Sequence, residues 1–406
     1  MKRALVLSGG GGKGAYQFGV WKALRKLKID FDIVTGTSIG ALNGALIAQN
    51  DYFSLGYLWL KTNFATLFNY ELKNDINTFL GKKETIKMYK DGILKDKGMD
   101  TIHIENLVKR FIDEKKLRKS EIDYGLVTFN LSDFKEVSLS KKNIPNGKLN
   151  DYAVASATCF PAFKIKEIDG KKYVDGGYYD NLPINLAVEM GAEEVIAVDL
   201  GAIGLNQEVK NKNIKITTIK PNNTLGSLLV FDRKTSRKNI DYGYNDTMKV
   251  FGYLDGKKYT FNKNDLSNNY NLYKENISKL IFEHVSNELV IKVIKDSNIN
   301  LILNNENNKF NEVVEFLGST YKIVDSKIYN INLYNRKIKR EFNKKILEDS
   351  NNGKDLLDIK GLINDNINRK LITYFYNNSN LNDLLTRRLA LIFTKQYVAS
   401  IYLKVI

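Results

Sequence analysis

Short apolar runs that end in glycine-rich turns constrain the fold of this 406-residue chain more than any other feature. Residues 3–8 (RALVLS) lead into GGGGKG, and residues 31–35 (FDIVT) lead into GTSIG. Helical patterns follow each turn, at residues 15–27 and 39–49. Strands that alternate with helices predict an α/β fold with a mostly parallel sheet, covered by helices on both faces. Further strands are expected at residues 124–130, 135–138, 195–200 and 214–219.

Composition divides the chain into two parts. After about residue 262, Asn, Lys and Tyr dominate, glycine nearly disappears, and helical periodicity takes over. We therefore expect a catalytic-type α/β domain over residues 1–262 and a mainly helical C-terminal domain over residues 263–406. Residues 50–120 read as a polar, helical insertion, which would form either a lid or plain surface helices.

The second glycine turn, Gly36-Thr37-Ser38-Ile39-Gly40, is a G-x-S-x-G motif between an expected strand and an expected helix. In that context the motif is typical of a nucleophile elbow, which lifts the serine hydroxyl clear of the backbone. Side chains at the positions of Gly36 and Gly40 would collide across so sharp a turn. The Ile39 N–H would lie at a helix N-terminus, facing a developing oxyanion. The alternative is a tight strand–helix turn with a capping serine.

The first glycine turn comprises Gly9, Gly10, Gly11, Gly12, Lys13 and Gly14. It matches G-x-G-x-x-G, but the acidic residue that a dinucleotide site needs at the end of the next strand is missing. A P-loop is disfavoured because Gly14 follows Lys13 where Ser or Thr is required. Consecutive glycines can instead point several N–H groups at one anionic oxygen. A serine nucleophile nearby favours this oxyanion-hole interpretation.

A serine nucleophile needs a base, and the chain has only two histidines, His103 and His284. Both lie in helical patterns, without a glycine turn and without a following acidic residue that would orient the ring. We expect them to be ordinary surface or core residues. A Ser-His-Asp triad is therefore poorly supported, and a carboxylate has to be considered as the base.

Asp175 is the best carboxylate candidate, because it ends a short strand and is followed by Gly176 and Gly177 in a tight loop. Asp180 and Asp199 are its rivals. Asp180 lies further into a polar turn, and Asp199 suits a strand-end cap. A structural Asp-Gly turn is the alternative interpretation of Asp175.

Together these stretches resemble the patatin family of lipid acyl hydrolases. The resemblance is carried by GGGGKG, GTSIG and DGG in that order, supported by ASATCFPAF (155–163), NLP (181–183), GAEEVIAVDL and, more weakly, GYNDTMK (243–249). It covers residues 1 to about 260 and implies a three-layer patatin-like fold. The remaining residues resemble no family that we can name.

The resemblance implies a Ser–Asp dyad in which Ser38 is the nucleophile and Asp175 the general base. The N–H groups of Gly10, Gly11 and Gly12 would hold the oxyanion, and no cofactor or metal would be needed. The expected reaction is hydrolysis of carboxylic esters in phospholipids or lysophospholipids, through an acyl-serine intermediate. Two alternatives stay open: an acyltransferase that uses the same dyad, and a non-catalytic protein that binds nucleotides or nucleic acid.

The formal net charge of +16 favours anionic partners, although an AT-rich coding sequence would also yield a lysine-rich chain. We expect an anionic membrane surface as partner and no nucleic acid. The single cysteine, Cys159, excludes an intrachain disulfide, and one cysteine with two histidines argues against a Cys/His metal site. No signal peptide or membrane span is recognisable, so the expected location is cytoplasmic, peripheral to the membrane.

Overall fold

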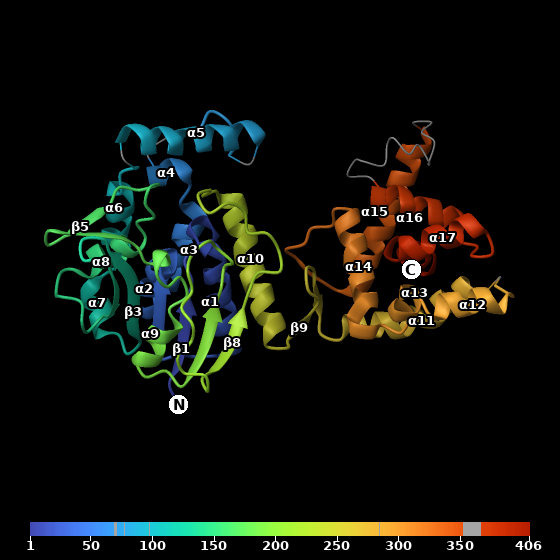
Figure 1. The fold of residues 1–406 in the computed structure, drawn as a ribbon, viewed down its shortest axis with the longest axis horizontal. Helices are drawn as coiled ribbons and strands as arrows, with labels where there is room; N and C mark the ends of the chain where they lie inside the picture. The colour runs from blue at the N-terminus through green and yellow to red at the C-terminus, as the bar shows by residue number, and fades with distance from the viewer. Residues whose placement is uncertain (69–70, 77, 97, 284, 352–366) are drawn as a thin grey trace. The chain divides into compact units, whose positions relative to one another are not determined.

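The computed structural model describes residues 1–68, 71–76, 78–96, 98–283, 285–351 and 367–406. They divide into two compact units, Met1–Val250 and Phe251–Ile406, which are described separately (Figure 1). The division lies before the boundary expected after residue 262. Among the described helices, none is both long and apolar enough to span a bilayer.

The first unit is organised around a sheet that has eight strands within the described residues. The strands are β1 (Arg3–Leu7), β2 (Ile33–Thr37), β3 (Asp123–Asn130), β4 (Lys135–Ser140), β5 (Lys166–Ile168), β6 (Lys171–Asp175), β7 (Glu194–Val198) and β8 (Lys215–Ile219). Their order is β5-β6-β3-β2-β1-β7-β8, with β4 also paired to β3. The neighbours β3, β2, β1, β7 and β8 are parallel, whereas β4, β5 and β6 form antiparallel pairs. The predicted α/β class with a mostly parallel sheet is confirmed.

Helices cover both faces of this sheet. The described helices of this unit are α1 (Ala15–Leu27), α2 (Ile39–Ala48), α3 (Tyr52–Lys61), α4 (Phe64–Phe68), α5 (Phe79–Asp96), α6 (Ile102–Phe111), α7 (Glu114–Lys119), α8 (Leu149–Ser156), α9 (Ile184–Glu189) and α10 (Arg233–Val250). On one face, Ala4 and Val6 of β1 pack against Ile184 and Ala187 of α9. On the other face, α2 lies so close that a Cβ on Gly44 would be 3.1 Å from a methyl carbon of Val34. The result is a three-layer α/β unit.

The predicted segments agree with the observed elements to within a few residues. The first strand ends at Leu7, and β2 begins at Ile33, which pairs with Ala4 of β1. The insertion over residues 50–120 forms the helices α3 to α7. Figure 1 shows α5 at the periphery of the first unit, beside α4.

One edge of β3 is shared by two strands. Strand β4 pairs with Gly125–Asn130 along the opposite edge. Strand β2 pairs with the first part of β3, so that Thr37 lies opposite Val127. Strand β6 continues along the same edge, and Asp175 lies opposite Thr128. The ends of β2 and β6 therefore meet at neighbouring positions of β3, which brings together segments far apart in the sequence.

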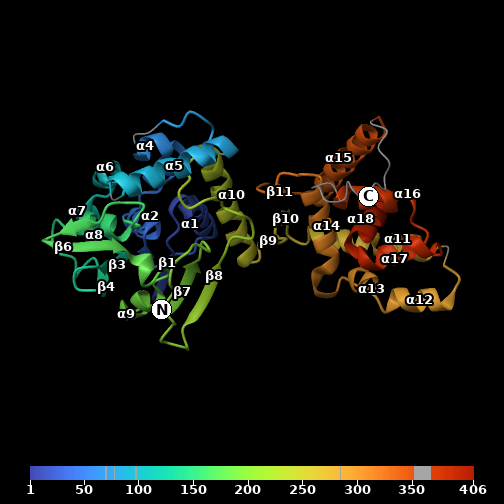
Figure 2. The same ribbon diagram turned by 45° about the horizontal axis from the view of Figure 1, so that its top comes forward.

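The second unit is mainly helical, as predicted. Its elements are β9 (Leu254–Asp255), β10 (Thr260–Asn262), α11 (Asp265–Phe282), α12 (Glu288–Lys295), α13 (Asn298–Leu303), α14 (Lys309–Thr320), β11 (Ile328–Tyr329), α15 (Ile331–Asn351), α16 (Ile367–Asn377), α17 (Leu384–Ile392) and α18 (Thr394–Val405). Helix α18 is central and contacts α11, α13, α14, α16 and α17 (Figure 2).

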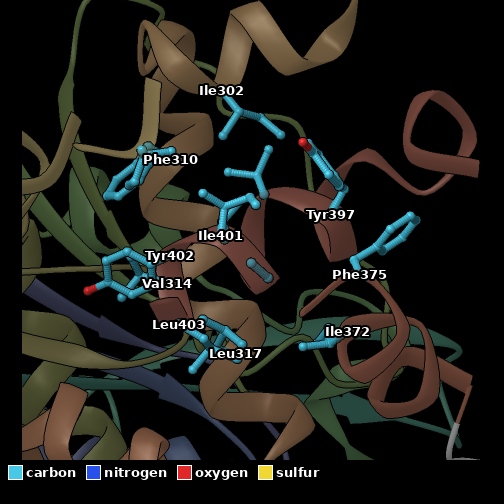
Figure 3. Close-up of a cluster of buried hydrophobic side chains, with 14 of the residues drawn as sticks. Ile302, Phe310, Val314, Leu317, Ile372, Phe375, Tyr397, Ile401, Tyr402 and Leu403 are labelled. Atoms are coloured by element: carbon cyan, nitrogen blue, oxygen red, sulfur yellow. The ribbon is translucent and has the colours of Figure 1, made fainter. Parts of the chain in front are cut away.

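The core of the second unit forms around the side chains of α18. Figure 3 shows Tyr397, Ile401 and Tyr402 among apolar side chains from α13, α14 and α16. The buried hydroxyl of Tyr402 lies within hydrogen-bond distance of two side-chain oxygens, those of Asn269 (2.9 Å) and Asn335 (2.8 Å), and can donate to either. The contact gives this hydroxyl, buried in an apolar core, a hydrogen-bond partner.

Candidate active site

Ser38 lies in the turn between β2 and α2, in a backbone conformation that residues other than glycine seldom adopt. Its φ is 57° and its ψ is −127°. The turn is so tight that a Cβ on Gly36 would be 2.3 Å from the carbonyl oxygen of Gly40. A Cβ on Gly40 would be 2.3 Å from the carbonyl oxygen of Leu7. The structure thus places Ser38 in a strained strand–helix turn that requires both glycines.

Asp175 ends β6 and is buried. Its backbone N–H donates to the carbonyl of Thr158 (2.9 Å), and its Oδ1 accepts the N–H of Gly177 (2.8 Å). The Ser38 side chain lies close enough to this carboxyl group to lower its pKa. Burial raises the pKa of Asp175 to about 6, and the nearby Ser38 side chain and the Gly177 N–H offset part of that rise. Ser38 and Asp175, predicted from separate motifs, lie together.

The two glycines after Asp175 leave room for this arrangement. A Cβ on Gly176 would be 2.2 Å from the carbonyl oxygen of Val127, so only glycine fits beside β3 there. A Cβ on Gly177 would be 3.1 Å from Asp175 Oδ1, against the carboxylate itself. The Asp-Gly-Gly loop therefore lets the chain pass close to both β3 and the carboxyl group.

The rival carboxylates have other partners. Asp180 is buried, and burial raises its pKa to about 6, but its Oδ1 accepts from the amides of Leu182 and Gln207 (both 3.3 Å). Asp199 pairs with Lys220 at 2.9 Å beyond the end of β7. His103 lies on α6, and His284 falls outside the described residues. Among these candidates, the structure brings only Asp175 to Ser38.

The amides of the first glycine turn differ in their availability. The Gly9 N–H donates to the carbonyl of Asn181 (3.1 Å), and the Lys13 N–H donates to that of Gly10 (3.1 Å). A Cβ on Gly9 would be 3.1 Å from the Cβ of Ser38, so this turn runs directly beside the serine. Lys13 Nζ donates to the carbonyl of Gly201 (3.3 Å), which ties the loop to the segment after β7.

Gly12 has a partner that the sequence did not reveal. Its N–H donates to the carbonyl oxygen of Leu228 at 2.7 Å. A Cβ on Gly12 would also be 2.2 Å from the carbonyl oxygen of Val230. We call residues 225–231 the strap, since this segment lies against the glycine turn. In this structure the N–H of Gly12, an expected oxyanion donor, is already hydrogen-bonded to the strap.

Three predicted donors remain available. Within the part of the chain that the structure describes, no protein acceptor is found for the N–H groups of Gly10, Gly11 and Ile39. Gly11 has a φ of 50°, in the left-handed region that favours glycine. Ile39 is the first residue of α2, where the positive end of the helix dipole favours an anion.

Several supporting residues were not identified from the sequence. The N–H of Ser38 donates to Ser156 Oγ (2.9 Å), and this hydroxyl donates to the carbonyl of Val127 (2.6 Å). Asn43 Nδ2 donates to the carbonyl of Gly14 (3.0 Å), and Trp59 Nε1 donates to Asn43 Oδ1 (3.1 Å). Ser156 lies within the ASATCFPAF stretch, which was a signal for it, whereas Asn43 stands outside every motif.

An apolar pocket opens next to Ser38. Helices α2, α3 and α6 form its walls, together with Phe231 of the strap. Its lining begins at Ile39, the neighbour of Ser38, and continues through Leu42 and Leu46 along α2. Asn43 is the one amide side chain in the lining, and its groups are bonded to Gly14 and Trp59. A pocket of this character suits a hydrocarbon chain better than a polar group.

A serine beside a buried carboxylate, next to a glycine turn and an apolar pocket, provides the groups that nucleophilic attack on an ester of an apolar acid requires. Residues 5–188 match the family model described as patatin-like phospholipase. This match confirms, over residues 5–188, the resemblance noted in the sequence.

Several relatives match about half of the chain. Patatin-like phospholipase domain-containing protein 7 of Rattus norvegicus is 30% identical over 207 residues, 49% of this chain and 14% of that protein. Patatin-like phospholipase domain-containing protein 6 of Homo sapiens is 31% identical over 211 residues (49% and 13%). Lysophospholipase NTE1 of Mycosarcoma maydis is 30% identical over 206 residues (50% and 10%). The chain thus spans less than a fifth of these relatives' length.

Two solved structures align with nearly the whole chain, with low similarity. VipD from Legionella pneumophila aligns with 99% of this chain and 90% of its own, with a TM-score of 0.37 and 14% identity. The type III effector ExoU aligns with 98% and 76%, with a TM-score of 0.34 and 12% identity.

Proposed function

We propose that this protein hydrolyses carboxylic ester bonds of phospholipids or lysophospholipids, with Ser38 as nucleophile and Asp175 as general base. The observation that carries the proposal is the placement of Ser38 beside the buried Asp175 carboxyl group, where the ends of β2 and β6 meet at neighbouring positions of β3. The match of residues 5–188 to the patatin-like phospholipase family model and the apolar pocket beside Ser38 support lipid esters as the substrate class.

In the proposed reaction, Asp175 accepts the Ser38 proton while Ser38 Oγ attacks the ester carbonyl carbon. The tetrahedral intermediate collapses, the protonated alcohol or lysolipid leaves, and an acyl group stays on Ser38. Asp175 then takes a proton from water, which attacks the acyl-serine and releases the fatty acid. A base with a pKa of about 6 is ionised at neutral pH and is more basic than an exposed aspartate.

The oxyanion would be held by backbone amides on either side of Ser38. Gly10 and Gly11 approach from the glycine turn, and Ile39 from the start of α2. Removing one donor of this kind typically lowers the rate by about 10²–10³-fold. Gly12 would join them only after its hydrogen bond to Leu228 opens.

Mapping of a covalent label tests the proposal directly. The full chain is incubated with a long-chain fluorophosphonate, digested, and the modified peptide is sequenced by mass spectrometry. Phosphonylation at Ser38 is expected, and it should be lost in Ser38→Ala and strongly slowed in Asp175→Asn. Asp180→Asn, which changes a carboxyl group of similar burial and pKa, serves as the matched control and should be labelled normally.

Phospholipid and lysophospholipid hydrolysis is then followed by release of free fatty acid. Activity that survives unchanged in Ser38→Ala, or a label on another residue, would rule out the proposed nucleophile. Acyl transfer to an added alcohol in preference to water would identify an acyltransferase with the same dyad.

A further inference from the structure

Helix α5 presents a face to solvent that is both cationic and apolar. Phe79, Lys83, Ile86, Lys90 and Leu94 follow one another at steps of three or four residues, so they lie along one stripe of the helix. The apolar members are far more exposed than is usual: Phe79 81%, Ile86 67% and Leu94 72%. Large apolar side chains arranged together in this way mark an interaction surface.

The flanks of this stripe continue the pattern. Leu80 is 59% exposed, and Lys82 and Lys87 are exposed beside it. We call the set Phe79, Leu80, Lys82, Lys83, Ile86, Lys87, Lys90 and Leu94 the α5 outer face. Of the acidic residues of α5 whose side chains are described, Glu84 accepts the amides of Lys73 and Asn74 and Asp91 is half-buried. The outer face is therefore positively charged.

The opposite face of α5 holds the helix in place. Thr85 and Tyr89 are buried there, and a Cβ on Gly81 would be 2.0 Å from the carbonyl oxygen of Asp75. The hydroxyl of Tyr89 donates to the carbonyl of Leu229 in the strap (3.3 Å). Figure 1 shows α5 at the outside of the first unit. The exposed apolar side chains therefore belong to a helix whose opposite face is packed against the first unit.

We propose that the α5 outer face docks the protein on an anionic lipid surface. Its apolar side chains would enter the headgroup–acyl boundary while its four lysines meet anionic headgroups, which is how cationic amphipathic helices bind membranes. Charge complementarity selects this partner, since the patch is basic and the whole chain carries +16. The inference rests on the proposed function, which gives the protein a lipid substrate in a membrane.

The position of α5 fits this role. Tyr89 joins it to Leu229 of the strap, and the adjacent Leu228 accepts the N–H of Gly12 in the glycine turn. The docking helix is therefore linked through two hydrogen bonds to the turn that runs beside Ser38. A lipid surface bound at α5 would lie on the side of the first unit from which the strap reaches the site.

Vesicle co-sedimentation tests the proposal independently of catalysis. The full chain in a Ser38→Ala background is mixed with vesicles of phosphatidylcholine, with or without phosphatidylserine. Changing Lys82, Lys83, Lys87 and Lys90 to Gln is expected to weaken binding to the anionic vesicles on the order of 100-fold. The matched control removes four exposed lysines elsewhere on the same unit by changing Lys26, Lys115, Lys116 and Lys119 to Gln. The control should lose less than about fivefold, roughly the effect of one basic residue near the surface.

A second variant set tests the apolar contribution. Changing Phe79, Ile86 and Leu94 to Ser leaves the charge unaltered and should weaken binding at high salt, where the lysines are screened. Equal loss in the two lysine sets, equal binding to neutral and anionic vesicles, or no vesicle binding at all would overturn the proposal. Binding to an acidic protein but not to vesicles would overturn it as well.

The proposal and the proposed function can fail separately. Hydrolysis of a water-soluble short-chain ester, measured with Ser38 restored, should be the same in wild type and in the α5 lysine variant. An inactive wild type that still binds vesicles through α5 would refute the function and keep the docking surface. An active wild type whose vesicle binding does not depend on the α5 lysines would refute the docking surface and keep the proposed function.

Discussion

The backbone N–H of Ser38 donates a hydrogen bond of 2.9 Å to the hydroxyl of Ser156, which in turn donates to Val127 of β3. This relay holds the strained turn in place. We predict that Ser156→Ala lowers kcat by about tenfold to a hundredfold with little change in KM, because the serine loses its position rather than its substrate contacts. An unsatisfied amide should also cost about 1–3 kcal/mol of stability.

Ser132→Ala is the matched control for Ser156→Ala. Its hydroxyl likewise accepts a backbone N–H, from Lys172 at 2.9 Å, but at an exposed turn away from Ser38. Steady-state kinetics and urea unfolding should show near-wild-type values for it. A similar loss of kcat in both variants would contradict the positioning role of Ser156.

The rate should depend on pH through Asp175. Because the carboxyl group has to be ionised to accept the Ser38 proton, kcat/KM is expected to rise with pH, with a midpoint near the pKa of about 6, and to be level above it. A soluble ester measured over a wide pH range gives this profile. In Asp180→Asn the midpoint should stay, although Asp180 has a similar pKa of about 6; a midpoint that moves with Asp180 would contradict the assignment.

Asp175 should also make the folded protein less stable at neutral pH. The unfolded chain releases this proton near the ordinary pKa of 3.8, whereas the folded chain keeps it until about 6. Stability therefore falls as pH rises from about 4 to 6, and the loss persists above. We predict that Asp175→Asn is more stable than wild type at pH 7.5 by about 1–3 kcal/mol. The difference should vanish toward pH 4 in urea unfolding; a constant difference would argue against it.

Filling the apolar pocket should change the preference for acyl-chain length. Leu58 of α3 lines the pocket, so Leu58→Trp is expected to lower kcat/KM for long-chain esters about tenfold or more while a butyryl ester is hydrolysed normally. Leu60→Trp is the control, since Leu60 is half-buried on the same helix but outside the pocket lining. An equal loss for short and long esters would mean that this pocket does not hold the chain.

Glycine at position 40 should be irreplaceable for packing. In Gly40→Ala the new Cβ would lie 2.3 Å from the carbonyl oxygen of Leu7, and backbone atoms cannot swing away. A loss of about 2–4 kcal/mol is expected in urea unfolding. Gly92→Ala, inside α5, meets only the flexible Met99 side chain at 3.2 Å and should gain up to about 1 kcal/mol. Comparable effects in the two variants would contradict the tight turn.

The two glycine turns and the strands before them could be predicted because their signals are local. An apolar run followed by glycine marks a strand that ends in a turn, and G-x-S-x-G adds the sharp bend at Ser38. The start of β2 was less accurate, because pairing with Ala4 of β1 sets it at Ile33. Asp175 was selected over its rivals from its own loop.

The parts that escaped prediction depend on contacts between distant segments. The strap reaches the glycine turn from beyond residue 224, and no residue type at Leu228 signals that its carbonyl oxygen meets the Gly12 N–H. Ser156 and Asn43 likewise act through partners far away in the sequence. The sequence of α5 does not show which of its apolar residues are exposed, because these residues are not confined to the face that packs against the first unit.

Strand β3 sets the spacing between the two residues of the proposed dyad. Thr37 is opposite Val127 and Asp175 is opposite Thr128, so the spacing between the two reactive groups is measured along a single stretch of backbone that contributes no reactive group itself. One residue inserted between Val127 and Thr128 would slide Asp175 away from Ser38 and reverse the face of every later side chain in β3. The reaction proposed for residues 38 and 175 therefore depends on the length of β3 between Val127 and Thr128, although neither reactive residue lies on that strand.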